Sequence, residues 1–192
     1  MNQLDEIRKV ASDAEQLFSA AEVEAAISRV GAEVSERLGT ANPIVLTVLN
    51  GGIIFAGKLL MHLNFPLEID SINASRYRGE TQGSHIQWLL KPAVPLNGRT
   101  VLIVDDVLDE GVTLAEIVAY CRAEGAQAVY TAVLVDKDLG TEKPCRADFV
   151  GLTASNRYLF GYGMDYKHYL RNAAGIFACG PAPSQESTEP NE

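Results

Sequence analysis

The chain has 192 residues, of which 47% are hydrophobic and 21% charged, as is typical of a soluble globular protein with a substantial core. Its 16 Lys and Arg residues against 25 Asp and Glu give a formal net charge of −9, which disfavours nucleic-acid and anionic-membrane binding because both need a basic surface. No apolar run approaches the roughly 18 residues of a membrane span, and the N-terminus lacks the apolar core of a signal peptide. The three widely spaced cysteines predict neither a disulfide framework nor a CxxC site. We therefore expect a cytoplasmic protein.

The first strong pattern in the chain is an amphipathic helix. Ser19 and Glu22 have the spacing of a capping box, apolar residues recur at helical intervals over residues 19–38, and Gly39 marks the end. We expect this helix to contribute packing.

Strands and helices alternate over the rest of the chain. Strands are predicted over residues 44–49, 67–72, 101–104, 129–135, 148–152 and 157–160. Helices are predicted after the first and third of these strands, over residues 53–63 and from Thr113 to Gly125. The alternation predicts an α/β fold, with a mainly parallel twisted sheet flanked by helices, as one domain over residues 1–180. Residues 74–90 are polar and aperiodic, as in functional or mobile loops, and residues 181–192 are predicted to be a disordered acidic tail.

The loop after the third predicted strand carries the clearest chemical pattern. Four apolar residues deliver Asp105 and Asp106 to the carboxyl end of that strand, where open α/β sheets place their ligands. Asp109 and Gly111 follow, and a helix opens at Thr113. Amides at a helix N-terminus that is reached through a glycine turn can bind phosphate, and acids beside them can bind Mg²⁺ or sugar hydroxyls. Aspartates after a strand also cap helices, so the pattern alone leaves a purely structural role open.

The complete string is more specific than its parts. The sequence from Asp105 through Asp109 to Thr113 resembles the phosphoribosyl-diphosphate signature of the type I phosphoribosyltransferases, and the similarity extends over residues 40–175 in the order of the hypoxanthine-guanine branch. Four further segments carry the resemblance. In chain order they are the first loop, which often contains a non-proline cis peptide, the start of a segment placed like the mobile closing loop, the strand end that reads Val-Asp-Lys, and a hood segment. They lie at residues 48–52, 75–77, 135–137 and 158–172.

The resemblance implies both a fold and a reaction. The fold would be that of the type I phosphoribosyltransferases, with a small hood built from the terminal segments. The reaction would transfer a ribosyl 5-phosphate from phosphoribosyl diphosphate to a 6-oxopurine, hypoxanthine or guanine, and release pyrophosphate. Mg²⁺ is the implied cofactor, and a homodimer or homotetramer is the implied assembly. No nucleic-acid or membrane partner is expected.

The resemblance also implies roles for individual residues. The implied phosphoribosyl-diphosphate ligands are Asn50, Gly51, Asp105, Asp106, Asp109, Glu110, Gly111, Val112, Thr113 and Arg171. Within this set Asp105 and Asp106 would contact the ribose hydroxyls or their metal, the amides from Asp109 to Thr113 would cradle the 5-phosphate, and Arg171 would pair with pyrophosphate. Asp109 would also be the general base near the purine N7.

The base would be held by a second group of residues. The implied purine-binding residues are Lys137, Tyr158, Leu159 and Asp165. Lys137 would donate to the 6-oxo group, Tyr158 would stack on the ring, and the Leu159 carbonyl would accept from a guanine amino group. Asp165 would also be a metal ligand, but for a second Mg²⁺ that bridges the pyrophosphate. A mobile closing loop would begin at Ser75, Arg76 and Tyr77.

The sequence departs from the family pattern at the first loop, where Asn50 stands in place of the lysine found in many relatives. Arg76 or Arg78 is the predicted replacement for that positive charge. Two other functions stay open within this fold: a different purine or xanthine specificity within the same reaction, and a non-catalytic sensor of phosphoribosyl diphosphate. A receiver-like protein with acidic strand ends is a third alternative, but it gives no reason for the Glu-Gly-Val-Thr sequence or the hood pattern.

Overall fold

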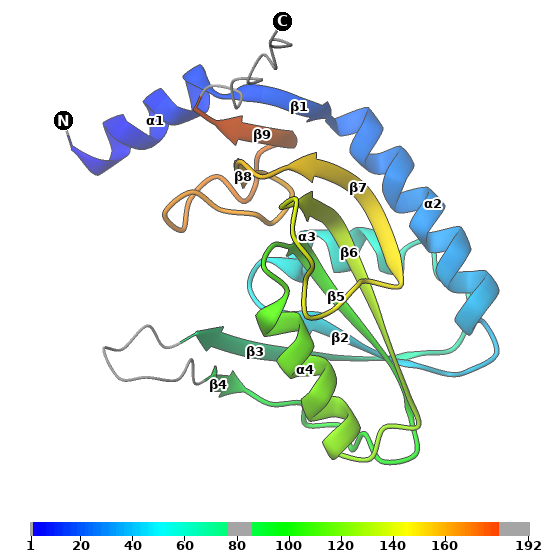
Figure 1. The fold of residues 1–192 in the computed structure, drawn as a ribbon. Helices are drawn as coiled ribbons and strands as arrows, with labels where there is room; N and C mark the ends of the chain where they lie inside the picture. The colour runs from blue at the N-terminus through cyan, green and yellow to red at the C-terminus, as the bar shows by residue number, and fades with distance from the viewer. Residues whose placement is uncertain (1, 77–85, 181–192) are drawn as a thin grey trace, which may run out of the picture.

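The computed structural model describes residues 2–76 and 86–180, and its main layer is a six-stranded sheet (Figure 1). The strands of this sheet are β2 (Ile44–Val48), β3 (Glu68–Arg76), β4 (Ile86–Leu90), β5 (Thr100–Leu108), β6 (Ala128–Asp138) and β7 (Phe149–Ser155). Their order is β4-β3-β2-β5-β6-β7, with every neighbouring pair parallel except β3 and β4. The predicted α/β class with a mainly parallel sheet is therefore confirmed.

Helices cover both faces of this sheet. The helices α2 (Ala20–Leu38) and α3 (Gly52–Leu60) pack on one face and α4 (Val112–Ala123) on the other. Alternate residues of β5 enter the two cores, with Leu102 on the α2–α3 side and Ile103 on the α4 side, and both are 0% exposed. Burial on both faces explains the continuous apolar run of β5 and fixes the position of its carboxyl end.

A second, smaller sheet forms the predicted hood from both ends of the described chain. Its elements are the helix α1 (Gln3–Asp13) and the strands β1 (Glu15–Ser19), β8 (Tyr158–Phe160) and β9 (Gly175–Cys179), with strand order β1-β9-β8. The rings of Phe160 and Phe177 stack with centroids 5.3 Å apart, and Arg157 Nη1 donates to Glu15 Oε2 at 2.5 Å. The hood thus joins segments more than 140 residues apart, and it lies beside the carboxyl ends of β6 and β7 in Figure 1.

Several strands are longer than the sequence predicts, and the difference matters most in β5. The predicted strand ends at residue 104, whereas β5 continues to Leu108 because Val107 and Leu108 pair in register with Val135 and Asp136 of β6. Asp105 and Asp106 therefore lie within the last part of the strand and not after it. The continuous pairing holds their backbone more rigidly than a loop would.

The predicted polar loop also contains regular structure. The last residues of β3 pair with β4 in an antiparallel arrangement, with Ala74 opposite Trp88. The predicted closing loop begins at this hairpin, but Tyr77 and Arg78 lie outside the described residues, as does the predicted acidic tail. Within residues 2–76 and 86–180, no helix is both long and apolar enough to cross a membrane.

Candidate active site

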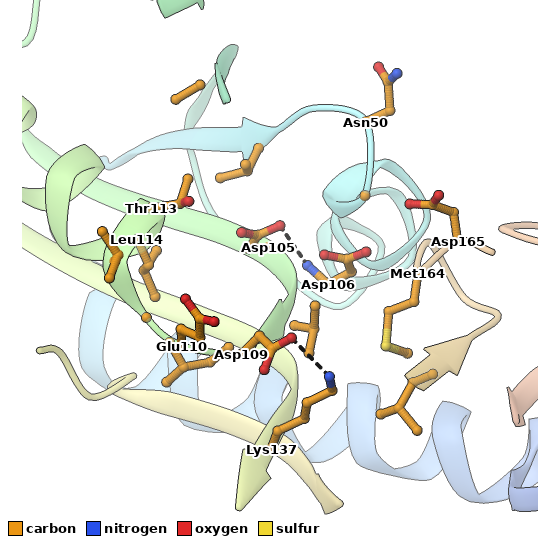
Figure 2. Close-up of a pocket in the computed structure, with 18 of the residues that line it drawn as sticks. Asn50, Asp105, Asp106, Asp109, Glu110, Thr113, Leu114, Lys137, Met164 and Asp165 are labelled. Carbon is orange, nitrogen blue, oxygen red and sulfur yellow. Dashed lines mark hydrogen bonds and ion pairs between the residues drawn. The ribbon is translucent and has the colours of Figure 1, made fainter. Parts of the chain in front are cut away.

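A cavity of about 460 Å³ lies where β2, β5 and β6 end and the hood begins (Figure 2). It brings together the residues predicted for phosphoribosyl diphosphate and the purine. The predicted residues that line it are Asn50, Gly51, Asp105, Asp106, Asp109, Glu110, Gly111, Val112, Thr113, Lys137, Tyr158, Leu159, Asp165 and Arg171. These residues come from four separate parts of the chain, and the fold alone makes them neighbours.

The first loop lies directly against the acidic end of β5. The peptide bond between Leu49 and Asn50 is cis, which agrees with the expectation from the resemblance. A Cβ atom at Gly51 would collide with the carboxylate of Asp106, so only glycine permits this approach. The Asn50 side chain is exposed and points away from the two aspartates in Figure 2.

Two adjacent carboxylates lie at the centre of the cavity wall. The Asp106 amide donates to Asp105 Oδ1 at 2.9 Å, and Asp106 is 7% exposed. Burial raises the pKa of the Asp105 carboxyl well above its usual range, and the negative charge of Asp106 raises it further. Burial also raises the pKa of Asp106, while the charge of Arg171 acts in the opposite direction on both carboxyls. This part of the site thus has an excess of negative charge.

A divalent cation fits this donor set. Mg²⁺ prefers oxygen ligands, and it commonly takes one or two carboxylates from the protein and the rest from water and substrate phosphates. Across the described ranges, no group of three or more His, Cys, Asp or Glu residues could hold a metal by itself. The pair Asp105 and Asp106 therefore suits a metal that arrives with a phosphorylated substrate.

The predicted phosphate loop, residues 109–113, joins β5 to α4. Gly111 is the N-cap residue of α4 and has a φ of 79°, a left-handed conformation that favours glycine. It provides no side-chain cap, so the amides of the first turn are left for an anion. A Cβ atom at Gly111 would also lie 3.3 Å from Leu108 Cδ1 and 3.4 Å from Cys145 Sγ. Gly111 thus meets both the conformational and the steric demand of this turn.

Asp109 and Lys137 form an ion pair on the floor of the cavity. Lys137 Nζ lies 2.9 Å from Asp109 Oδ2, and the dashed line in Figure 2 marks this contact. The lysine side chain is 10% exposed and the aspartate side chain 50%. The pair therefore presents a hydrogen-bond donor and an acceptor side by side to anything that enters the cavity.

The hood contributes an aromatic ring and a second ion pair. Tyr158 is 53% exposed and meets Tyr166 edge to face, with ring centroids 5.5 Å apart. Arg171 Nη2 lies 2.7 Å from Asp165 Oδ1, and Arg171 Nη1 donates to the Gly163 carbonyl at 2.5 Å. The His168 amide donates to Asp165 Oδ2 at 2.7 Å, so both oxygens of that carboxylate are held.

At Gly163 the hood loop, residues 161–174, closely approaches the first loop. It has a φ of 112°, and a Cβ atom there would collide with the Gly51 carbonyl oxygen. We expect Gly163→Ala to lower the free energy of unfolding by about 1–3 kcal/mol, since backbone strain of this kind costs that much before any collision is relieved. Thermal or urea unfolding measures the loss.

A matched glycine in α3 provides the control for this prediction. A Cβ atom at Gly57 would have no neighbour within 4 Å. Gly57→Ala should leave stability unchanged or raise it by up to about 1 kcal/mol, because alanine is the better helix former. Equal stabilities of the two variants would contradict the packing described for the hood loop.

Two predicted residues stay untested, and two residues in or beside the site were not predicted. Ser75 and Arg76 end β3, whose residue Ala74 lines the cavity, but no side-chain position is described for either. Met164, only 3% exposed, lines the cavity and was missed, because a lone methionine in a glycine-rich segment carries no distinctive signal. Lys143, which lies behind the predicted phosphate loop, was also missed, because a single lysine in a loop carries no signal of its contacts.

Comparisons with known proteins agree with this geometry. A family model for the phosphoribosyl transferase domain matches residues 13–167. The hypoxanthine-guanine phosphoribosyltransferase of Bacillus subtilis is 31% identical over 167 residues, which cover 86% of this chain and 93% of the relative. The hypoxanthine-guanine-xanthine phosphoribosyltransferase of Tritrichomonas foetus is 31% identical over 157 residues, which cover 81% of this chain and 86% of the relative.

A solved structure extends the agreement to the fold. The crystal structure of a hypoxanthine phosphoribosyltransferase from Staphylococcus aureus superimposes with a TM-score of 0.83 at 23% identity, covering 94% of this chain and 97% of that one. The acidic end of β5, the glycine-capped loop after it, and β1 and β8 of the hood thus lie within a family match that spans most of the sequence. On these grounds the chain belongs to the phosphoribosyltransferase domain family.

Proposed function

We propose that the protein converts hypoxanthine or guanine and phosphoribosyl diphosphate into IMP or GMP and pyrophosphate. The observation that carries this proposal is the Asp109–Lys137 pair, with its donor and acceptor 2.9 Å apart in the cavity. The relatives from B. subtilis and T. foetus, which are named for hypoxanthine and guanine, support the same class of base.

The pair matches one edge of a 6-oxopurine. The O6 and N7 atoms lie side by side on that edge. Lys137 would donate to O6, and Asp109 would accept the proton of N7 in the tautomer that carries one. Adenine has an amino group in place of O6, so it would set its own donor against the Lys137 ammonium and offer that N–H no acceptor.

Asp109 would act as the base of the reaction. As the bond between N9 and C1′ forms, the N7 proton would pass to the Asp109 carboxylate. The bond from C1′ to the pyrophosphate oxygen would break at the same time, and its electron pair would leave with pyrophosphate. The exposed face of Tyr158 would hold the ring in line with C1′, and the amides at the start of α4 would fix the 5-phosphate.

The remaining charged residues would serve the departing group. Arg171 would pair with pyrophosphate oxygens. Asp105 and Asp106 would hold one Mg²⁺ together with the substrate, and Asp165 would help to hold a second Mg²⁺ at the pyrophosphate. When bound, Mg²⁺ neutralises negative charge that develops on pyrophosphate. We therefore expect chelation of Mg²⁺ by excess EDTA to abolish turnover and added Mg²⁺ to restore it.

A panel of bases tests the proposed specificity. The purified protein would be supplied with phosphoribosyl diphosphate and Mg²⁺, and separately with hypoxanthine, guanine, xanthine or adenine, while nucleotide formation is followed. We expect turnover of hypoxanthine and guanine, and little or none of adenine. Turnover of xanthine alone would contradict the proposed base class. Binding of phosphoribosyl diphosphate with no turnover of any base would favour a sensor.

The cytoplasmic location and the homodimer or homotetramer stay predictions. Sedimentation of the purified protein tests the oligomeric state.

A further inference from the structure

One largely buried lysine side chain behind the active site has no role in the proposed reaction. Lys143 lies in the loop between β6 and β7, and its side chain is 10% exposed. Its ammonium donates to three oxygens: the Leu108 carbonyl at 2.8 Å, the Asp136 carboxylate at 2.6 Å and the Lys137 carbonyl at 2.5 Å. An ammonium has three N–H donors, so all of them are used and the side chain is fixed in place.

Two of these oxygens belong to the backbone of the site. Leu108 immediately precedes Asp109, and the Lys137 carbonyl belongs to the residue whose side chain pairs with Asp109. A single nitrogen atom therefore joins the ends of the adjacent strands β5 and β6 at the point where the donor and the acceptor leave them. The distance between the two functional side chains depends on this backbone spacing.

The same loop makes a second contact with the phosphate loop. The Cys145 thiol donates to the Gly111 carbonyl at 3.2 Å. A Cβ atom on Gly111 would lie 3.4 Å from that sulfur and 3.5 Å from Lys143 Cβ. The loop thus supports the phosphate loop on the side away from the cavity, at both its beginning and its glycine turn.

Charge balance alone does not account for this arrangement. The Asp136 side chain is 34% exposed, so water can solvate much of its charge without a lysine. The contacts of Lys143 with the Leu108 and Lys137 carbonyls do not neutralise any charge, but they connect the ends of β5 and β6. This geometry points to a positional function.

We propose that Lys143 is a positioning residue, which sets the phosphate loop and Asp109 at their working distance from Lys137. The catalytic part of this proposal rests on the proposed function. A displacement of about 1 Å in a reacting geometry can cost about 100-fold in rate. We therefore expect Lys143→Met to lower kcat/KM for phosphoribosyl diphosphate by about tenfold or more, at a temperature where circular dichroism shows the variant folded.

Two further variants separate positioning from stability. Lys143→Arg keeps the charge but spreads its donors over a planar fork, which cannot direct three bonds from one atom. Asp136→Asn keeps both carbonyl contacts of Lys143 and removes only the ion pair. If Lys143 positions the loop, the arginine variant recovers thermal stability more fully than kcat/KM, and the asparagine variant retains most of its activity. If the role is purely structural, stability and kcat/KM change together across the series. Lys9→Met, at an exposed lysine of α1, is the matched control and should behave as wild type.

Hydrogen exchange provides a readout that needs no substrate. We expect the backbone amides of residues 108–113 to exchange faster in Lys143→Met than in wild type, and those of α2 to be unchanged. A folded Lys143→Met variant with kcat/KM within twofold of wild type, or with unchanged exchange in residues 108–113, would overturn the proposal. If that variant does not fold, equal activity and exchange in Lys143→Arg and wild type would overturn it. Wild-type protein that turns over no oxopurine would refute the proposed function, while the exchange result would still decide the positional role.

Discussion

Replacing Asp109 with alanine is expected to lower kcat for hypoxanthine by about 10²–10⁴-fold, the range typical for loss of a general acid or base. The carboxylate would accept the purine N7 proton, and no other carboxylate of the described residues is paired with Lys137. The KM for phosphoribosyl diphosphate should change much less, because the phosphate contacts come from backbone amides. Steady-state kinetics with both substrates varied measure the two effects.

A neighbouring aspartate provides the control for this variant. Asp138 ends β6 and accepts a hydrogen bond from the Gly140 amide at 2.9 Å. Asp138→Asn should keep kcat within about twofold of wild type, as surface substitutions outside a site commonly do. An Asp109→Ala variant that folds normally and retains full kcat would remove Asp109 from the role of base.

Replacing Lys137 with methionine is expected to lower kcat/KM for hypoxanthine and guanine by about 10- to 100-fold. A hydrogen bond to a charged group contributes about 1.5–3 kcal/mol, and tenfold corresponds to about 1.4 kcal/mol. Methionine keeps much of the length of the buried stem and removes the ammonium. Discrimination against adenine should fall as well, because the substitution lowers kcat/KM less for adenine than for an oxopurine.

The selectivity ratio is the decisive quantity for this second variant. It compares kcat/KM for hypoxanthine with kcat/KM for adenine, so a general loss of folded protein cancels. Lys91→Met is a suitable control, since Lys91 Nζ lies 5.0 Å from the centroid of the Tyr120 ring, away from the cavity. An unchanged ratio in Lys137→Met would show that another group recognises the substituent at the purine 6-position.

The local pattern around β5 could be predicted from sequence for a physical reason. A strand buried on both faces must be apolar throughout, and the acids and glycine that follow it interrupt that pattern. The cavity residues of this segment, from Asp105 to Thr113, are therefore close in sequence as well as in space. The exact end of β5 was not predictable, because pairing of Leu108 with β6 is a tertiary property.

The hood was harder to predict from residue patterns. In α1 only Ile7 is buried, and β1 has only five residues, none of them fully buried. Both segments contact partners from the other end of the chain: the Tyr166 hydroxyl donates to Glu6 of α1, and Arg157 donates to Glu15 of β1. These contacts cannot be found from either segment alone. The contacts of Lys143 belong to the same class, since a single lysine in a loop carries no signal of the oxygens around it.

The most direct test of the account is a product balance. The protein would be incubated with phosphoribosyl diphosphate, hypoxanthine and Mg²⁺, and the nucleoside monophosphate and pyrophosphate formed would both be quantified. The account predicts IMP and pyrophosphate in equal amounts, each dependent on the base and lost in Asp109→Ala. Tight binding of phosphoribosyl diphosphate with neither product formed, or release of pyrophosphate without the nucleotide, would contradict it.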